Sequence, residues 1–251
     1  MKEILREIAK IAADNDISTP YLVGGIPRDI YLNAETEFSD IDITTNSSDI
    51  IRLALLCCGF FNKYFKVFDD GHLSIYLDDN ILDFSSHFIS DSAVKYAGDI
   101  SDNKLKEVYS RDFTMNTLHM DLSSLEIIDP LGVAKKDIDD RIIKTPVSPE
   151  ISLTDDPNRI WRAVRFSSKL DFNIDEEIID FIKENKSYFE NHPEIKPAYI
   201  ESTIGESMKL NPKRTLENLI SMDILGLVPL SGEFKEELIK RRMIKDYLDA
   251  T

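Results

Sequence analysis

Apolar residues recur at helical spacing near the start of the chain. They lie on one face of a helix predicted over residues 2–14, at Leu5, Ile8, Ile11 and Ala12. The pattern then changes to short strands. YLVGG at 21–25 predicts a strand that runs into a glycine turn, and Pro27 fits the first turn of a following helix, where its missing N–H is not needed. SDIDITT at 39–45 alternates polar and apolar residues, which predicts a strand with one face in water.

The same two patterns continue along the chain. Residues 47–58 predict a helix, and two hairpins are predicted, one at 72–86 that turns at residues 78–80 and one at 118–129. Strand signals fade after about residue 145. Helical segments separated by prolines follow near 155–170, 175–189, 197–210, 212–222 and 232–249. The pattern therefore predicts an α+β chain, with a mixed α/β domain at 1–145 and a helical domain at 146–251.

Composition limits the class of protein. The chain has 251 residues, of which 42% are hydrophobic, and this is enough to bury a core. No run of eighteen apolar residues is present, and the charged N-terminus lacks a signal core, so neither a membrane span nor a secretory leader is expected. The two cysteines, Cys57 and Cys58, are adjacent and predict no disulfide framework and no zinc site. We therefore expect a cytoplasmic protein.

The net charge of −16 argues against non-specific binding of nucleic acid, because the chain as a whole repels phosphate. Contact with RNA would need local basic groups. One candidate set lies along a single predicted helix and comprises Arg159, Arg162, Arg165 and Lys169. A second set near the C-terminus is better explained as a solvated helix end, and comprises Lys235, Lys240, Arg241, Arg242 and Lys245.

Candidate chemistry begins with Asp40 and Asp42. One residue separates them on the predicted strand, so both carboxylates point to the same face. Two carboxylates this close favour a hard cation such as Mg²⁺, although an isolated pair is more often a solvated strand edge. Gly24 and Gly25 precede a helix, where backbone N–H groups can approach a phosphate, and Arg28 lies in its first turn. Together these features predict a site for a metal and a triphosphate.

Five ordered motifs between residues 21 and 174 resemble one family. LVGGIPRDIYL (22–32) and SDIDITT are similar to the first two motifs of the CCA-adding and poly(A) polymerase branch of the polymerase-β-like nucleotidyltransferases. SRDFTMNTL (110–118) resembles the family's RRDFTINAL, and DPLGVAKKDIDDRIIKT (129–145) resembles its DP.GG..DL..K.IR segment. TDDPNRIWRAVRFSSKLDFNI (154–174) resembles EDPLRILRAIRFAARLGFXI. The resemblance implies a polymerase-β-like head, a small mixed sheet with helices, and an all-α neck, with the family's body and tail absent from these 251 residues.

The resemblance also implies roles. Asp40 and Asp42 hold two Mg²⁺ ions, and Asp83 is a candidate third carboxylate, although a polar strand end explains it equally well. Nucleotide binding falls to Gly24, Gly25, Arg28, Arg111, Asp112, Asn116, Asp156, Arg159, Arg162 and Arg165. From chemistry alone, Asp112 is as well explained by a helix N-cap, and the spacing of Asp156 and Arg159 by a surface ion pair. In the family this last pair recognises the base of ATP or CTP. Trp161 between the arginines is more readily a core residue than a base-stacking one.

Four positions depart from the family pattern, namely Pro27, His87, Ser110 and Asp155. Two of them, Ser110 and His87, replace arginines and would weaken binding of triphosphate or RNA. The favoured function is template-independent addition of nucleotides to an RNA 3′ end, with CCA-type addition to tRNA first and poly(A) tailing second. The sequence does not separate these from addition of A alone or of CC alone. A catalytically weak nucleotide- or RNA-binding relative is a third candidate. Transfer of a nucleotide to a small molecule or protein is a fourth, and the Asp156–Arg159 pair speaks against it. The oligomeric state is not predicted.

Overall fold

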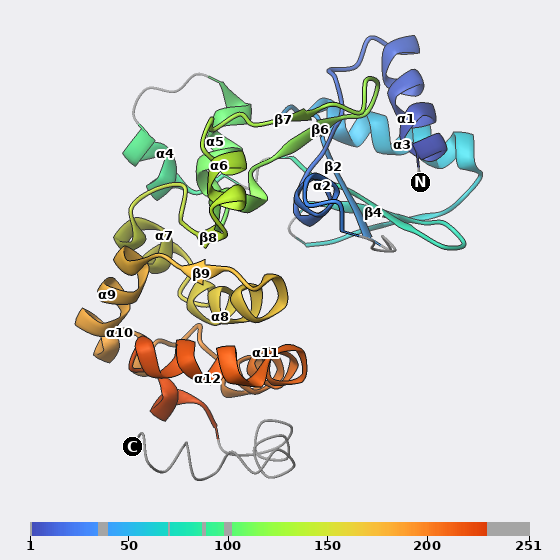
Figure 1. Ribbon diagram of the computed structural model, residues 1–251. Coiled ribbons are helices and arrows are strands. Elements are labelled where there is room, and N and C mark those ends of the chain that lie inside the picture. Colours follow the sequence, from blue (N-terminus) through green and yellow to red (C-terminus); the bar gives the residue numbers. More distant parts are fainter. Residues whose placement is uncertain (1, 35–39, 70, 87–88, 98–101, 230–251) are drawn as a thin grey trace. The chain divides into compact units, whose positions relative to one another are not determined.

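The computed structural model describes residues 2–34, 40–69, 71–86, 89–97 and 102–229 (Figure 1). Contacts between residues divide the chain into two compact units, Met1–Ile138 and Asp139–Thr251. The limit of the head domain expected at residue 145 stays a prediction. In the part of the chain that the structure describes, no helix is long and apolar enough to cross a membrane.

The first unit is built on a mixed sheet whose described strands follow the order β3-β4-β5-β2-β1-β6-β7. β2 and β5 are parallel neighbours, and the other neighbouring pairs are antiparallel. The strands are β1 (Tyr21–Leu22), β2 (Asp40–Thr44), β3 (Phe65–Val67), β4 (Leu73–Tyr76), β5 (Ile81–Phe84), β6 (His119–Asp121) and β7 (Ile127–Ile128). The small mixed sheet and its helices confirm the predicted α+β class.

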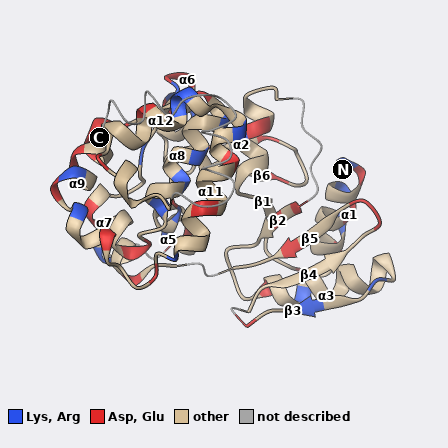
Figure 2. Cartoon of the chain, turned by 90° about the horizontal axis from the view of Figure 1, so that it is seen from below, with Lys and Arg blue, Asp and Glu red and all other residues tan. Residues whose placement is uncertain are grey.

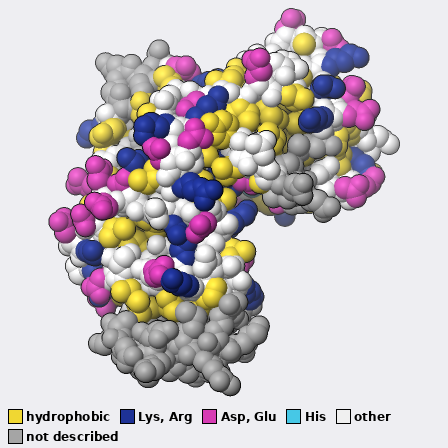
Figure 3. Space-filling model, viewed as in Figure 1, with side chains coloured by type: hydrophobic (Ala, Val, Ile, Leu, Met, Phe, Trp, Pro, Cys, Tyr) yellow, Lys and Arg dark blue, Asp and Glu magenta, His cyan; other side chains and the backbone are white. Residues whose placement is uncertain are grey.

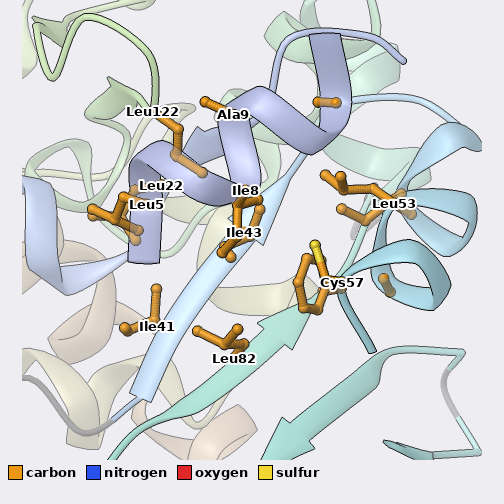
Figure 4. Packing of buried hydrophobic residues seen from close by; sticks show 14 of the residues in the cluster. Leu5, Ile8, Ala9, Leu22, Ile41, Ile43, Leu53, Cys57, Leu82 and Leu122 are labelled. Carbon is orange, nitrogen blue, oxygen red and sulfur yellow. The ribbon is translucent and has the colours of Figure 1, made fainter. Parts of the chain in front are cut away.

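Two helices, α1 (Lys2–Asp14) and α3 (Asp49–Phe61), supply apolar side chains to the core of this unit (Figure 4). Ile41 and Ile43 of β2 are fully buried in that core with Leu5 and Ile8 of α1 and Leu53 of α3. Successive side chains of a strand point to opposite faces, so burying the isoleucines turns the intervening aspartates to the other face of the sheet. The remaining helices of the unit are α2 (Gly25–Tyr31), α4 (Asp91–Ala97), α5 (Asn103–Ser110), the 3₁₀ helix η1 (Thr114–Asn116) and α6 (Ala134–Asp139).

The structure confirms most of the expected elements here. The helix predicted over 2–14 is α1, both hairpins are present, and Pro27 lies inside α2. The helix predicted over 47–58 begins at Asp49 and continues to Phe61, where Asn62 adopts a left-handed conformation with φ of 52° and ends it. The pattern did not predict α4, α5, α6 or β3, because segments of three to eight residues are too short to establish a period.

The second unit is mainly helical. Its elements are β8 (Ile142–Ile143), α7 (Pro149–Asp155), α8 (Arg159–Leu170), β9 (Asn173–Ile174), α9 (Glu176–Glu184), α10 (Lys186–Glu190), α11 (Pro197–Leu210), α12 (Pro212–Ser221) and the 3₁₀ helix η2 (Leu225–Leu227). β8 and β9 form a short parallel pair. The helices predicted near 197–210 and 212–222 are α11 and α12. The helix predicted near 155–170 is α8, which begins only at Arg159 and is preceded by the separate helix α7, and the helix predicted near 175–189 is divided into α9 and α10. The helix predicted at 232–249, with its basic cluster, lies outside the described residues.

Hydrogen bonds from Arg214 join α12 to the end of α8. Its Nε donates to the hydroxyl of Ser167 at 2.9 Å and to the main-chain oxygen of Phe172 at 3.2 Å. Its Nη1 reaches Asp171 at 3.0 Å, and its Nη2 reaches Asn173 at 2.7 Å. Because the planar guanidinium offers donors in several fixed directions, this one side chain fixes the turn that follows α8 relative to α12.

Candidate active site

The candidate catalytic carboxylates lie on two neighbouring strands, where Figure 2 shows acidic stretches on β2 and β5. Asp40 is exposed and Asp42 is half-buried, on the face of β2 opposite the buried isoleucines. The parallel register pairs Asp42 with Asp83 of β5. The structure therefore brings together the three carboxylates that the sequence singled out, although nothing in the sequence pattern specified this register.

Electrostatics around Asp42 favour a cation. The pKa of the Asp42 carboxyl is raised to about 6, chiefly by burial and also by the negative charges of Asp83 and Asp40. Arg111 and His72 act in the opposite direction. A carboxylate whose ionised form is disfavoured by burial and by neighbouring carboxylates gains from a nearby positive ion. His72 was not among the predicted site residues, and no motif or spacing marked it.

Asp83 has a fixed partner. The hydroxyl of Ser74, on β4, donates a short hydrogen bond to its carboxylate, and Ser74 is buried. The register places Ser74 directly opposite Asp83. Within the described part of the chain, no group of three His, Cys, Asp or Glu side chains is arranged to hold a metal ion. The carboxylate oxygens of Asp40 and Asp42 are donors of the kind that a hard divalent cation takes, whereas the carboxylate of Asp83 is bound to Ser74 of β4.

Gly24 lies directly against Asp42. It adopts φ of +78°, and a Cβ built on it would be 2.8 Å from Oδ2 of Asp42. The main-chain N–H of the preceding residue, Val23, donates to the carbonyl of Asp42 at 2.9 Å. Since only glycine combines this backbone conformation with such a close approach, the glycine turn and the carboxylate form one packed unit.

Arg28 is buried, with 2% of its side chain exposed. Its Nε donates to Asp29 at 2.8 Å, its Nη2 lies 2.6 Å from the same oxygen, and its Nη1 donates to Asn116 at 2.6 Å. A Cβ on Gly25 would be 3.1 Å from Nη2, so the second glycine gives this guanidinium its space. The structure therefore places Arg28 in an internal network, and its predicted contact with phosphate remains untested.

Asn116 extends this network to the SRDF motif. Its amide donates to Asp112 at 2.9 Å, and the same oxygen accepts the N–H of Phe113 at 2.8 Å. Both Asp112 and Asn116 are buried. Arg111 is half-buried at the end of α5. Ser110, where the family resemblance led us to expect an arginine, accepts the N–H of Ser90 at 2.9 Å and donates to the carbonyl of Lys106 at 2.7 Å.

A buried carboxylate anchors the C-terminal end of β2. Glu107 of α5 accepts a hydrogen bond from the amide of Asn46 at 2.7 Å and from the hydroxyl of Thr44 at 3.3 Å. All three side chains are buried, and Asn46 has a left-handed φ of 54°. This cluster joins the strand that carries Asp42 to the helix that ends at Arg111. The sequence gave no sign of it, because its members are 61 and 63 residues apart.

The second unit holds the remaining predicted residues at the junction of α7 and α8. Asp156 follows α7, and Arg159 begins α8 and is buried. Nε of Arg159 lies 3.9 Å from Oδ2 of Asp156, so the two predicted partners are close but beyond hydrogen-bonding distance. Arg162 and Arg165 are half-buried on α8, where the guanidinium of Arg165 lies 4.9 Å from the ring centre of Phe166. Trp161 is fully buried, which confirms it as a core residue.

The surface carries basic side chains (Figure 3) although the net charge of the chain is −16. On the face shown in Figure 3, acidic and basic side chains are interspersed. His87, the second departure from an expected arginine, lies outside the described residues.

Comparison with known proteins places this geometry in a family. Residues 20–144 match the model of the poly(A) polymerase head domain. These residues belong to that family. The segment includes Asp40, Asp42, Asp83, the glycine turn and the SRDF motif, so the head domain contains every candidate catalytic carboxylate.

Curated relatives extend the likeness of the head domain into the second unit. A CCA-adding enzyme of Geobacillus is 32% identical over 221 residues, which cover 85% of this chain and 49% of the relative. Poly(A) polymerase I of Escherichia coli is 26% identical over 200 residues, 76% of this chain and 41% of the relative. The chain thus spans about half the length or less of these two relatives.

Solved structures share the fold. A CCA-adding enzyme in complex with ATP matches 90% of this chain and 51% of its own, with a TM-score of 0.72 and 21% identity. A Thermotoga maritima CCA-adding enzyme complexed with tRNA matches to the same extent. These matches confirm the polymerase-β-like fold of the head, as the sequence motifs predicted.

Proposed function

We propose that this chain is a template-independent nucleotidyltransferase that adds nucleotides from ATP and CTP to an RNA 3′ end, with CCA-type addition to tRNA as the favoured reaction. One observation carries the proposal. Asp42, with its raised pKa, lies beside Asp40 and Asp83 and directly beneath the Gly24 turn. A cluster of carboxylates next to a backbone that only glycine can form suits a metal and a triphosphate better than it suits a structural role.

The chemistry assigned to the head is phosphoryl transfer. The 3′ oxygen of the RNA forms a bond to the α-phosphorus, the bond from that phosphorus to the bridging oxygen breaks, and pyrophosphate leaves. Asp40 and Asp42 are the residues that would hold Mg²⁺, which when bound would offset the charge of the triphosphate. Asp83, which is hydrogen-bonded to Ser74, adds negative charge next to Asp42. Arg111 opposes the rise in the pKa of Asp42 more strongly than His72 does, and it is assigned to phosphate or ribose.

Base selection is assigned to the second unit. Asp156 offers an acceptor and Arg159 offers donors. Cytosine presents the N4 amino group and the N3 acceptor, and adenine presents the N6 amino group and the N1 acceptor, so the pair suits both bases. Uracil and guanine present the opposite pattern on that edge. Arg162 and Arg165 are assigned to the RNA backbone, because their half-buried guanidinium groups lie on the same helix as Arg159.

Poly(A) tailing is the second candidate, because the similarity to Escherichia coli poly(A) polymerase I covers 76% of this chain. The acceptor and the nucleotide separate the two reactions. CCA-type addition uses both C and A on tRNA and stops, whereas tailing extends diverse RNAs with A alone. A catalytically weak binding relative would incorporate neither.

The test is nucleotide incorporation by the full chain. Purified protein with Mg²⁺ receives labelled ATP, CTP, GTP or UTP and one of four acceptors: tRNA lacking CCA, tRNA ending in C, tRNA ending in CC, or an unrelated RNA. We expect C and A to be added to the tRNAs only. Asp40→Asn with Asp42→Asn should abolish incorporation without lowering the melting temperature, since removing close like charges relieves repulsion.

Asp78→Asn is the matched control. It makes the same chemical change at an exposed ion pair with Lys63, in the turn between β4 and β5, and should leave incorporation unchanged. A-only extension of any RNA would replace the CCA assignment with poly(A) tailing. Absence of incorporation from every nucleotide, by folded protein, would refute the enzymatic function of this chain.

A further inference from the structure

Arg159 is held by a residue outside the family motifs. Its Nη1 donates to the hydroxyl of Ser152 at 2.6 Å and to the main-chain oxygen of the same residue at 3.2 Å. Ser152 lies in α7 and is 1% exposed, and Arg159 is 7% exposed. Both bonds are therefore shielded from water, where a hydrogen bond to a charged group is strongest.

The two neighbouring aspartates contact other atoms of the guanidinium. Oδ2 of Asp155 lies 3.8 Å from Nη2, and Oδ2 of Asp156 lies 3.9 Å from Nε. These separations allow Coulomb attraction but not hydrogen bonds, so they constrain direction weakly. The other oxygen of Asp156 accepts the N–H of Asn158 at 3.0 Å, which fixes that carboxylate at the start of α8.

The bonds to Ser152 determine where the donors of Arg159 point. A guanidinium is planar, so fixing Nη1 at two acceptors fixes the plane and the direction of the Nε and Nη2 edge. That edge is the one nearest the two aspartates. A site that distinguishes bases by hydrogen bonds depends on donors and acceptors at a set spacing, because a mismatched base then leaves buried polar groups unpaired.

We propose that Ser152 is a positioning residue for base selection, which orients the guanidinium of Arg159 so that cytosine and adenine are accepted and uracil and guanine rejected. This inference rests on the proposed function, and it goes further by naming the contact that sets selectivity. Ser152 itself does not touch the base. Its hydroxyl acts through Arg159.

The experiment compares Ser152→Ala with the unchanged chain. For each nucleotide we measure kcat/KM for incorporation and, independently, affinity by quenching of Trp161, the single tryptophan of the chain. Removing one hydrogen bond to a charged group should reduce the ratio of cytosine to uracil, and of adenine to guanine, about tenfold or more in both measurements. A role limited to packing would lower all four nucleotides together and leave the ratios unchanged.

Ser207→Ala is the matched control. Ser207 is also a buried helical serine, and the hydroxyl donates to the carbonyl of Thr203 at 2.7 Å. It should change stability to a similar degree but leave selectivity intact. Ser152→Cys, close in size and a poorer hydrogen-bonding partner, provides a second variant if alanine unfolds the protein.

The outcomes separate the two proposals. Unchanged selectivity in folded Ser152→Ala, with an active and selective parent chain, would overturn the role of Ser152 and leave the proposed function standing. If the unchanged chain binds nucleotides selectively but does not incorporate them, the enzymatic function is overturned. The ratios of affinity for cytosine over uracil and adenine over guanine would still decide the role of Ser152. A parent that neither incorporates nor binds selectively would overturn both.

Discussion

Gly24→Ala is the most direct perturbation of the candidate active site. The added Cβ would be 2.8 Å from Oδ2 of Asp42, a separation that real Cβ contacts do not show, and the φ of +78° is itself unfavourable for alanine. The backbone strain alone should cost about 1–3 kcal/mol of folding stability. In addition the carboxylate must move away from the new methyl group. A displacement of about 1 Å at a reacting centre reduces turnover by about 100-fold.

Gly132→Ala separates these two effects. Gly132 has φ of +77°, but a Cβ built on it meets no atom within 4 Å. It therefore carries the backbone strain without the contact. We expect both variants to melt several degrees lower, and only Gly24→Ala to lose about 100-fold in Mg²⁺-dependent incorporation. Equal losses of incorporation in the two variants, or full activity of Gly24→Ala, would refute the claim that the glycine exists to accommodate Asp42.

Three further predictions concern buried polar groups. Burial lowers the pKa of His119 to about 4, so the unfolded chain binds a proton below about pH 6.5 while the folded chain does not. The contribution of His119 to the free energy of unfolding is therefore complete above pH 6.5 and falls by about 3 kcal/mol towards pH 4. Urea titrations at several pH values should show this fall, and His119→Gln should reduce it. Arg28→Met leaves Asp29 buried without its cation and should lower the free energy of unfolding by about 3 kcal/mol or more, as measured by thermal unfolding. Unchanged stability with weaker ATP binding would instead mean that Arg28 contacts phosphate. Glu107→Leu removes the acceptor of the buried amide of Asn46 and should cost about 2 kcal/mol in urea unfolding, and an unchanged midpoint would show that the cluster is not stabilising.

Local patterns predicted the parts of the fold that depend on nearest neighbours. The alternation in β2 placed Asp40 and Asp42 on one face, because the pleat of a strand decides this within three residues. The periodicity of α1 was sufficient because one face of that helix is buried. The family resemblance supplied the remaining candidate residues of the head, and the match over residues 20–144 supports the family.

Long-range partners were beyond the reach of such patterns. Arg28 precedes Asn116 by 88 positions, so its burial and its bond to that amide depend on how η1 packs against α2. The register that pairs Asp83 with Asp42 is likewise set by the assembled sheet. Ser152 and Arg159 are only seven residues apart, yet a break between two helices separates them. The helix predicted near 155–170 began after Ser152, so the pattern did not place Ser152 in any element next to Arg159.

The alternation of β2 also limits how this segment can change over generations. Asp40 and Asp42 lie in the same five-residue strand as Ile41 and Ile43, whose side chains pack in the core. Inserting or deleting a single codon within this stretch would exchange the two faces, sending carboxylates into the interior and isoleucines into water. Point substitutions of Asp40 or Asp42 should impair the proposed activity alone. Changes of length would impair folding and activity together, so heritable length variation should accumulate in the loops on either side of the strand and be absent from the strand itself.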